Sequence, residues 1–175
     1  ADTEFSVDRG FYYDPFSLEL SSDTEGATIR YTLDGTEPNT GYGTIYSGPI
    51  QIDTTSYVRT IAYKAGWLPT NVDTQTYIFV NDVINQLPNN DPPGAGWPNS
   101  GYAGDQVQVF DYAMDPEVTT DPDYADLMDD ALLSISTISI VTNQDSLIHP
   151  NTGIYRNALQ QGKNSYNIGS PAGRK

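Results

Sequence analysis

The sequence predicts a mainly β protein in which a two-sheet sandwich, residues 1–80, precedes an acidic extension. Short stretches of the first part alternate apolar and polar residues, which is typical of strands with one buried face. The 15 Gly and 12 Pro of the 175-residue chain favour turns over long helices, and its 13 Tyr suit half-exposed pleated surfaces. Many short strands are therefore expected, and nothing in this part favours a helical bundle.

The strands of the sandwich are predicted in order from this alternation. Residues 16–21 and 27–33 are the first two, and Asp34-Gly35 then supplies a tight turn. A further strand begins at Ile45, is broken by Gly48-Pro49 and resumes with Ile50 and Ile52.

Residues 57–63 form the clearest central strand. Its odd-numbered positions, from Tyr57 to Tyr63, face one way, and its even-numbered positions, from Val58 to Ala62, face the other. Residues 75–80 close the set. Six or seven short strands at this spacing predict two packed sheets.

After residue 80 the chain changes character. Residues 81–105 are rich in Asn, Pro and Gly and are expected to form a connector. An acidic extension follows over residues 106–160, with neither Lys nor Arg before Arg156. Residues 161–175 are expected to be a frayed tail.

Within the extension the pattern predicts a strand, a helix and a strand. The strands are residues 106–112 and 135–142, and the helix is residues 122–133, with Pro122 at its first position. Thr120 or Asp121 is the expected helix cap. These elements are too few to bury a core of their own.

The charge and composition exclude several classes of partner and site. A formal net charge of −15 argues against nucleic acid and anionic membranes, because both would repel the chain. The chain has no Cys, which excludes disulfides, thiol catalysis and Cys-ligated zinc. No stretch approaches the roughly 18–20 apolar residues of a membrane span, so membrane insertion is not expected.

No catalytic residues are predicted, and the chain is not expected to be an enzyme. The only histidine is His149, and a zinc site or a Ser-His-Asp triad would have to be built around it. Ser146 is near in sequence, but a loop histidine is the simpler interpretation. Paired carboxylates for glycoside hydrolysis need an enclosed cleft, of which the sequence gives no sign.

A structural calcium ion is the one cofactor that the sequence makes worth considering. Calcium takes six to eight oxygen ligands, and the candidates are Asp115, Glu117, Asp121, Asp123 and Asp126. The alternative is a solvated acidic face in which Asp121 and Asp123 stabilise the start of a helix.

Aromatic residues in turn-rich segments are candidates for stacking on sugars or on a partner. They are Trp97, Tyr102, Trp67, Tyr12, Tyr13 and Tyr42. In small sandwiches such rings usually cap the core. Trp67 is expected to be such a lid, which leaves Trp97 and Tyr102 as the better contact candidates.

Three stretches of the first 80 residues resemble a known family. Residues 27–39 read Ala27-Thr-Ile-Arg-Tyr-Thr-Leu-Asp-Gly-Thr-Glu-Pro-Asn, and Tyr46-Ser-Gly-Pro-Ile-Gln-Ile and Val58-Arg-Thr-Ile-Ala-Tyr-Lys-Ala-Gly-Trp follow. This pattern resembles the chitobiase/β-hexosaminidase C-terminal domain, also called fibronectin-III-associated, over about residues 4–80. The resemblance implies an immunoglobulin-like sandwich attached to extracellular bacterial enzymes and adhesins, with no catalytic residues to carry over.

The second half resembles the region ahead of and entering CotH-type kinase domains of secreted bacterial proteins. The segments that carry the resemblance begin at Gln108 (Gln-Val-Phe-Asp-Tyr-Ala-Met-Asp), Ile135 (Ile-Ser-Thr-Ile-Ser-Ile-Val-Thr) and Asn151 (Asn-Thr-Gly-Ile-Tyr). The nucleotide- and metal-binding motifs that should follow are missing. The resemblance therefore implies lineage and compartment but no kinase activity.

Together these features predict an extracellular or cell-surface, non-catalytic structural or interaction module of bacterial origin. The predicted strand that carries Ile138, Ile140 and Val141 needs the edge of a β-sheet to pair with. The first module, a neighbouring domain or another copy of the chain would supply that edge. Pairing between copies would build a fibre. The alternatives are a carbohydrate-binding accessory module of a glycan-active enzyme and an N-terminal CotH-type fragment without an active site.

Overall fold

The computed structural model describes residues 2–86, 89, 91–103, 106–149 and 153. The chain divides into two compact units. The first comprises Ala1–Ile84 and Asp126–Val141, and the second comprises Asn85–Ala125 and Thr142–Lys175.

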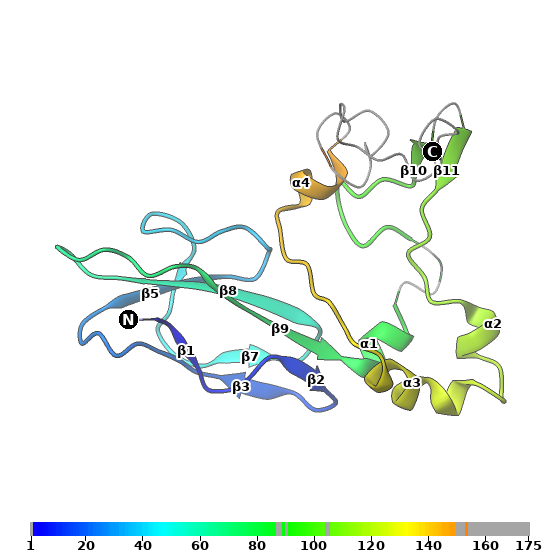
Figure 1. Cartoon of the computed structure of the whole chain (residues 1–175), viewed down its shortest axis with the longest axis horizontal. Helices are drawn as coiled ribbons and strands as arrows, with labels where there is room; N and C mark the ends of the chain where they lie inside the picture. The colour runs from blue at the N-terminus through cyan, green and yellow to red at the C-terminus, as the bar shows by residue number, and fades with distance from the viewer. Residues whose placement is uncertain (1, 87–88, 90, 104–105, 150–152, 154–175) are drawn as a thin grey trace, which may run out of the picture. The chain divides into compact units, whose positions relative to one another are not determined.

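Nine short strands form the sheets of the first unit. They are β1 (Glu4–Phe5), β2 (Gly10–Tyr12), β3 (Phe16–Leu18), β4 (Leu20–Ser21), β5 (Thr28–Thr32), β6 (Thr44–Ile45), β7 (Ile50–Ile52), β8 (Ser56–Tyr63) and β9 (Asp73–Phe79). A five-stranded sheet of order β2-β9-β8-β5-β6 forms one layer, and the pairs β3–β7 and β1–β4 lie across from it (Figure 1). The predicted mainly β fold is confirmed, and the arrangement is consistent with an immunoglobulin-like sandwich.

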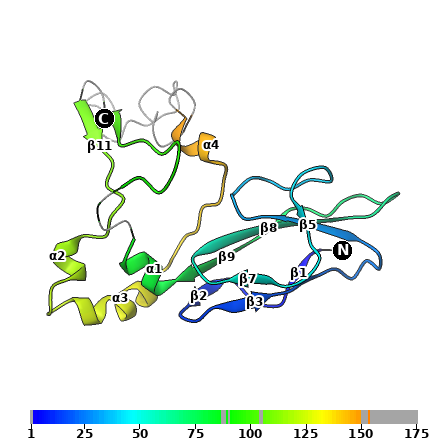
Figure 2. The ribbon, with the colours of Figure 1, turned by 180° about the vertical axis from the view of Figure 1, so that it is seen from behind.

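The pairing inside the five-stranded sheet is mixed. Strand β8 lies antiparallel between β5 and β9, while β2 pairs with β9 in parallel, with Gly10 opposite Tyr77. The same layering is visible from behind in Figure 2. The short strand β6 ends the sheet at one edge, and β2 ends it at the other.

The core lies between the two layers. Strand β8 contributes its even-numbered positions, and Val58 and Thr60 are fully buried. Leu18 of β3 and Ile52 of β7 meet them from the opposite layer. Burial of such aliphatic side chains contributes about 1.5–3 kcal/mol each, so this interface between layers stabilises the unit.

Two of the buried hydroxyl groups inside the sandwich have polar partners, whereas Arg59 Nε is buried without one among the described residues. The Tyr77 hydroxyl donates to the Val7 carbonyl oxygen at 2.9 Å, and burial raises the pKa of Tyr77. The Thr60 and Thr3 hydroxyl oxygens lie 2.7 Å apart. These bonds offset the cost of removing hydroxyl groups from water.

The sequence pattern missed or misplaced some details of the sandwich. Strands β1 and β2 are too short to display a period of two. The predicted strand over residues 16–21 is two strands, because β3 pairs with β7 whereas β4 pairs with β1. The predicted strand over residues 27–33 ends at Thr32, and Leu33 is 46% exposed because the chain turns there.

The predicted helix over residues 122–133 is displaced and interrupted. Residues 121–125 form a turn, in which the Asp121 carbonyl oxygen accepts a bond from the Ala125 amide at 2.8 Å. The 3₁₀ helix η1 (Ala125–Leu127) and the helix α3 (Met128–Ser134) follow. The Asp121 side chain accepts a bond from the Asp123 amide at 2.8 Å, so the acidic residue stabilises the turn rather than a helix start at Pro122.

The strand predicted over residues 135–142 does not form in the described chain. The segment belongs to no sheet, although Ile135 has extended backbone angles and the chain runs on without a helix until Asn143. A strand requires a partner for its backbone groups. No strand of the described residues pairs with this segment, and Ile135, Ile138 and Ile140 are exposed rather than buried.

The described residues of the second unit form two paired strands and two short helices. Strands β10 (Ser100–Ala103) and β11 (Gln106–Val109) pair antiparallel, and the helices are α2 (Pro116–Thr119) and α4 (Gln144–Ile148). Strand β10 falls in the predicted connector, and β11 ends three residues before the predicted strand does. The helix α1 (Val80–Ile84) belongs to the first unit.

The predicted tail, residues 161–175, lies outside the described residues. Among the helices that are described, none has the length and apolar character required to cross a membrane.

Candidate functional site

The segment 135–141 lies over the outer face of β2 and β9. Thr137, Ser139 and Val141 line a cavity of about 690 Å³, together with residues of β9 and the start of β2. The Ser139 hydroxyl lies 2.8 Å from the Thr76 hydroxyl of β9. Thr137, Ser139 and Val141 therefore lie beside the sheet, although Thr137 and Ser139 are themselves exposed.

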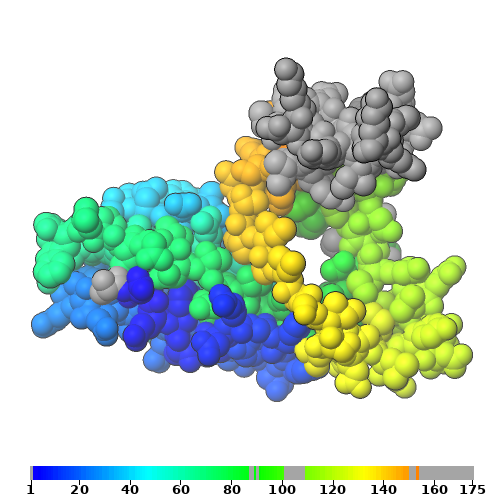
Figure 3. Space-filling view, in the orientation of Figure 1, coloured from blue at the N-terminus to red at the C-terminus, as the bar shows by residue number. Residues whose placement is uncertain are grey.

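The isoleucine side chains of the same segment are exposed to solvent. Ile138 is 85% exposed and Ile140 is 75% exposed, and Ile135 at the start is 68% exposed. The segment runs over the surface in Figure 3, where its colour passes from yellow to orange. Of the three predicted assembly residues, Ile138 and Ile140 are thus outward, whereas Val141 is half-buried. Clustered exposed aliphatic side chains of this kind are typical of an interaction surface.

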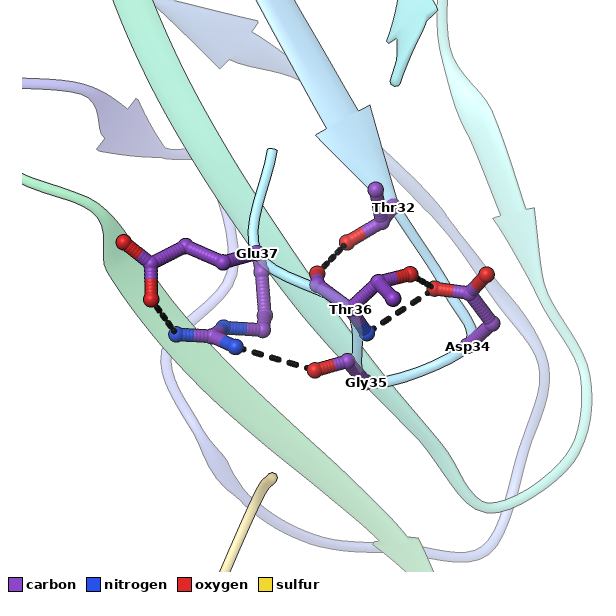
Figure 4. A network of polar contacts seen from close by, with 6 residues as sticks. Thr32, Asp34, Gly35, Thr36 and Glu37 are labelled. Carbon is purple, nitrogen blue, oxygen red and sulfur yellow. Dashed lines mark hydrogen bonds and ion pairs between the residues drawn. The ribbon is translucent and has the colours of Figure 1, made fainter. Parts of the chain in front are cut away.

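A second ordered surface is the loop that joins β5 to β6. The Asp34 carboxylate accepts hydrogen bonds from the Thr36 amide, at 3.0 Å, and from the Thr36 hydroxyl (Figure 4). The Thr32 hydroxyl donates to the Thr36 carbonyl oxygen at 2.6 Å. The Thr36 hydroxyl bond lowers the pKa of Asp34 most, so the carboxylate is ionised at neutral pH.

Arg59 of β8 fastens this loop to the sheet. Its Nη1 donates to the Gly35 carbonyl oxygen at 2.9 Å, and its Nη2 contacts the Glu37 carboxylate at 3.3 Å (Figure 4). The Arg59 side chain is 15% exposed, whereas that of Glu37 is 69% exposed. The loop is therefore held by a largely buried guanidinium group, and the exposed carboxylate adds little.

The predicted aromatic contact residues have different surroundings. Trp67 was expected to cover the core, but it is 67% exposed, because Gly66 adopts φ +82° and turns the chain away from the end of β8. The Lys64 Nζ lies 6.0 Å from its ring centroid. Trp97 is half-buried, with its ring perpendicular to that of Tyr112 at 5.9 Å. The side chain of Tyr102 lies outside the described residues.

The predicted calcium ligands are not brought together among the described residues, which contain no group of three or more His, Asp or Glu side chains suited to a metal ion. Asp115 caps α2 by accepting a bond from the Glu117 amide at 2.9 Å. Asp121 and Asp123 share a turn, as described above, and Asp126 lies in η1. Calcium binding stays a prediction of the sequence.

His149 and Ser146 have structural surroundings. Asn143 caps α4, and its side-chain oxygen accepts bonds from the Ser146 amide at 2.8 Å and the Ser146 hydroxyl at 2.9 Å. The His149 amide donates to the Asp145 carbonyl oxygen at 3.2 Å and ends the helix. The Ser146 hydroxyl thus supports a helix start, and the absence of a catalytic role stays a prediction.

The sequence could have revealed more of the loop after β5. Asp34-Gly-Thr was interpreted only as a tight turn, although Asp two residues before Thr is a known turn-stabilising pair. The role of Arg59 had no local signal, since its partners are more than 20 residues away in sequence.

Comparisons with curated proteins and with solved structures gave no match. The similarity of the second half to CotH-type proteins stays a prediction, and its last segment, except Gly153, lies outside the described residues. A comparison with family models confirms the similarity predicted for the sandwich: residues 7–74, which run from the loop before β2 to the start of β9, match the chitobiase/beta-hexosaminidase C-terminal domain.

Proposed function

We propose that this chain is a non-catalytic interaction module of a bacterial secreted or cell-surface protein and that it associates by strand pairing through residues 135–141. The match of residues 7–74 to a domain named for glycan-cleaving enzymes supports an accessory role and an extracellular location. The single observation that carries the association is the exposure of Ile138 and Ile140 on an extended segment without a strand partner among the described residues.

Physical chemistry favours a strand as the partner of this segment. Among the described residues its backbone groups are not part of a ladder, and Thr137, Ser139 and Val141 line the cavity at β9 whereas Ile138 and Ile140 are exposed. Ile and Val suit a pleated strand because their branched side chains have few rotamers to lose. An added strand would satisfy the backbone groups and bury the isoleucines at once. Another copy of this chain supplies such an edge, and head-to-tail repetition would give a fibre.

The test is the oligomeric state of the purified full chain, measured by sedimentation velocity over a range of concentrations and by negative-stain microscopy. The parent should form concentration-dependent oligomers, and the double variant Ile138→Asp/Ile140→Asp should remain monomeric. The matched control is Leu68→Asp, because Leu68 is 95% exposed on the same unit and outside the segment. A compact monomer at every concentration, or equal loss of association in the control, would contradict strand pairing.

The second candidate function is carbohydrate binding by an accessory module. The observation that favours it is the exposed Trp67 ring, since the faces of indole rings bury the apolar faces of sugars well. Trp97 is a weaker candidate because its ring packs on Tyr112. Loss of binding to chitin or cellulose oligosaccharides in Trp67→Ala, but not in Trp97→Ala, would favour Trp67 as the contact.

The third hypothesis is that the chain is an N-terminal fragment of a CotH-type kinase protein, and it predicts that the chain has no nucleotide-binding site. Calorimetry with ATP and Mg²⁺ should therefore give no heat of binding, and a saturable heat would show that a nucleotide site exists.

A further inference from the structure

A groove of about 630 Å³ lies beside β5 and β6, and its lining includes Tyr42 but neither tryptophan. Its lining includes Leu33 and Asp34 from the end of β5, and Tyr42 and Thr44 from the chain that enters β6. The Tyr42 side chain and Leu33 are each 46% exposed. The groove thus places an aromatic ring and an aliphatic side chain beside an ionised carboxylate.

The position of the Tyr42 ring is fixed by its hydroxyl and by its backbone. The Tyr42 hydroxyl donates to Asp34 Oδ2 at 3.3 Å and lies 3.2 Å from the Thr36 hydroxyl. The amides of Tyr42 and Asn39 each donate to the carbonyl oxygen of the other, at 3.2 and 3.0 Å. A ring that is held in place before binding loses little conformational freedom when a ligand stacks on it.

The backbone on the far side of Tyr42 is equally constrained. Gly43 adopts φ +107°, and a side chain there would come within 3.0 Å of the Tyr31 carbonyl oxygen. The Arg30 guanidinium donates to the Gly43 carbonyl oxygen at 2.5 Å and to the Tyr63 hydroxyl at 3.1 Å. A glycine is therefore required at this position for the chain to approach β5 closely. These contacts fix the backbone that forms the wall of the groove.

We propose that this groove binds a pyranose that is neutral or carries an amine. The apolar C–H face of such a ring would stack on Tyr42 and contact Leu33, while its hydroxyl or ammonium groups would donate to the free lone pairs of Asp34. Acidic sugars are disfavoured, because Asp34 and Glu37 lie at the loop, the guanidinium of Arg30 is already bonded, and the whole chain carries −15. The proposal rests on the carbohydrate-binding alternative above and locates it on a different surface from Trp67.

The test is a titration of the full chain, labelled with ¹⁵N, with three probes followed by NMR. The probes are the trimers of N-acetylglucosamine, of glucosamine and of galacturonic acid. The first two should shift the amide signals of residues 31–34 and 41–44, and the acidic trimer should not. Signal shifts confined to other residues, or equal shifts with the acidic trimer, would overturn the proposal.

Variants separate the groove from the rest of the molecule. Tyr42→Ala should weaken binding about tenfold or more, which is the loss expected when an aromatic ring no longer buries its face. Tyr42→Phe should bind within about threefold of the parent, since the stacking face remains. The control is Tyr13→Ala, because Tyr13 is 47% exposed and lies outside the groove. Asp34→Asn should weaken binding of the glucosamine trimer most.

The binding experiments distinguish failure of the Tyr42 groove from failure of carbohydrate binding by the whole chain. If the parent binds none of the trimers, both the groove and the carbohydrate-binding alternative fail. If the parent binds and Trp67→Ala, but not Tyr42→Ala, loses affinity, the alternative stands and the groove is wrong. Should Tyr42→Ala fail to fold, as its amide spectrum would show, the shift map of the parent and the comparison with Tyr42→Phe decide the matter.

Discussion

At the scale of single residues, two carboxylates organise the connections of the sandwich. Asp34 stabilises the loop after β5 through Thr36, and Asp82 of α1 accepts bonds from the Thr55 amide at 2.6 Å and the Thr54 hydroxyl at 2.7 Å. Burial raises the pKa of Asp82, but the hydrogen bonds from Thr55 and Thr54 outweigh it, so the pKa is lowered. The pKa of Asp34 is lowered chiefly by the Thr36 hydroxyl.

These pKa shifts predict a pH dependence of the free energy of unfolding. Because both carboxyl groups have a lower pKa in the folded chain than in the unfolded one, the folded chain binds fewer protons. The stabilisation is fully present above the unfolded pKa of about 3.9 and is lost as the pH falls through the folded values. Asp34→Asn and Asp82→Asn should each lower the free energy of unfolding at neutral pH by no more than about 0.5 kcal/mol, because solvent screens these largely exposed carboxylates, and the difference from the parent should shrink in acid.

The measurement is urea unfolding between neutral pH and pH about 3, a range that spans the unfolded carboxyl pKa. Asp23→Asn, in the exposed turn before β5, is the matched control and should follow the parent curve. A difference that persists unchanged in acid would show that the substitutions act through packing and not through charge.

At the scale of elements, the strands of the two layers differ in length and in how clearly their sequences alternate, but both layers contribute fully buried residues to the core. Strand β8 has eight residues and a clear alternation, whereas β3 and β7 have three residues each. Nevertheless Leu18 of β3 and Ile52 of β7 are as fully buried as Val58 of β8. A short strand can hold the centre of a core when its partner strand and the facing sheet fix its position.

This burial predicts a large effect of a single truncation. Leu18→Ala should lower the free energy of unfolding by about 2–5 kcal/mol, because it removes buried methyl groups and leaves a cavity. Leu68→Ala, the same substitution at a 95% exposed position, should change it by less than about 0.5 kcal/mol. Thermal and urea unfolding of both variants provide the measurement. Similar losses in the two variants would contradict the assignment of the core.

At the scale of the whole molecule, charge opposes association between copies. Each chain carries −15, so two copies repel one another, whereas burial of the exposed Ile138 and Ile140 side chains on strand pairing favours their association. The balance between these two effects depends on ionic strength.

Association through residues 135–141 should therefore strengthen with salt. Raising the salt from about 0.05 M to about 0.5 M shortens the screening length to well under 10 Å and removes most of the repulsion. Sedimentation velocity should show larger oligomers of the parent at the higher salt, and Ile138→Asp/Ile140→Asp should stay monomeric at both. Oligomers that dissociate as salt rises would instead indicate association through ion pairs.

The sequence by itself determined the mainly β class, the central strand β8 and the acidic character of the second half, because alternation and composition are local properties. It also marked Ile138 and Ile140 as residues of an extended segment. Only the tertiary structure decided which side chains of that segment face solvent, that Trp67 is exposed, and that Arg59 and Asp34 build one ordered loop. Those outcomes depend on residues far apart in the chain, whose contacts no local pattern encodes. Residues 135–142 illustrate both effects. Their side chains favour a strand, but a strand forms only where the edge of another strand accepts its backbone hydrogen bonds.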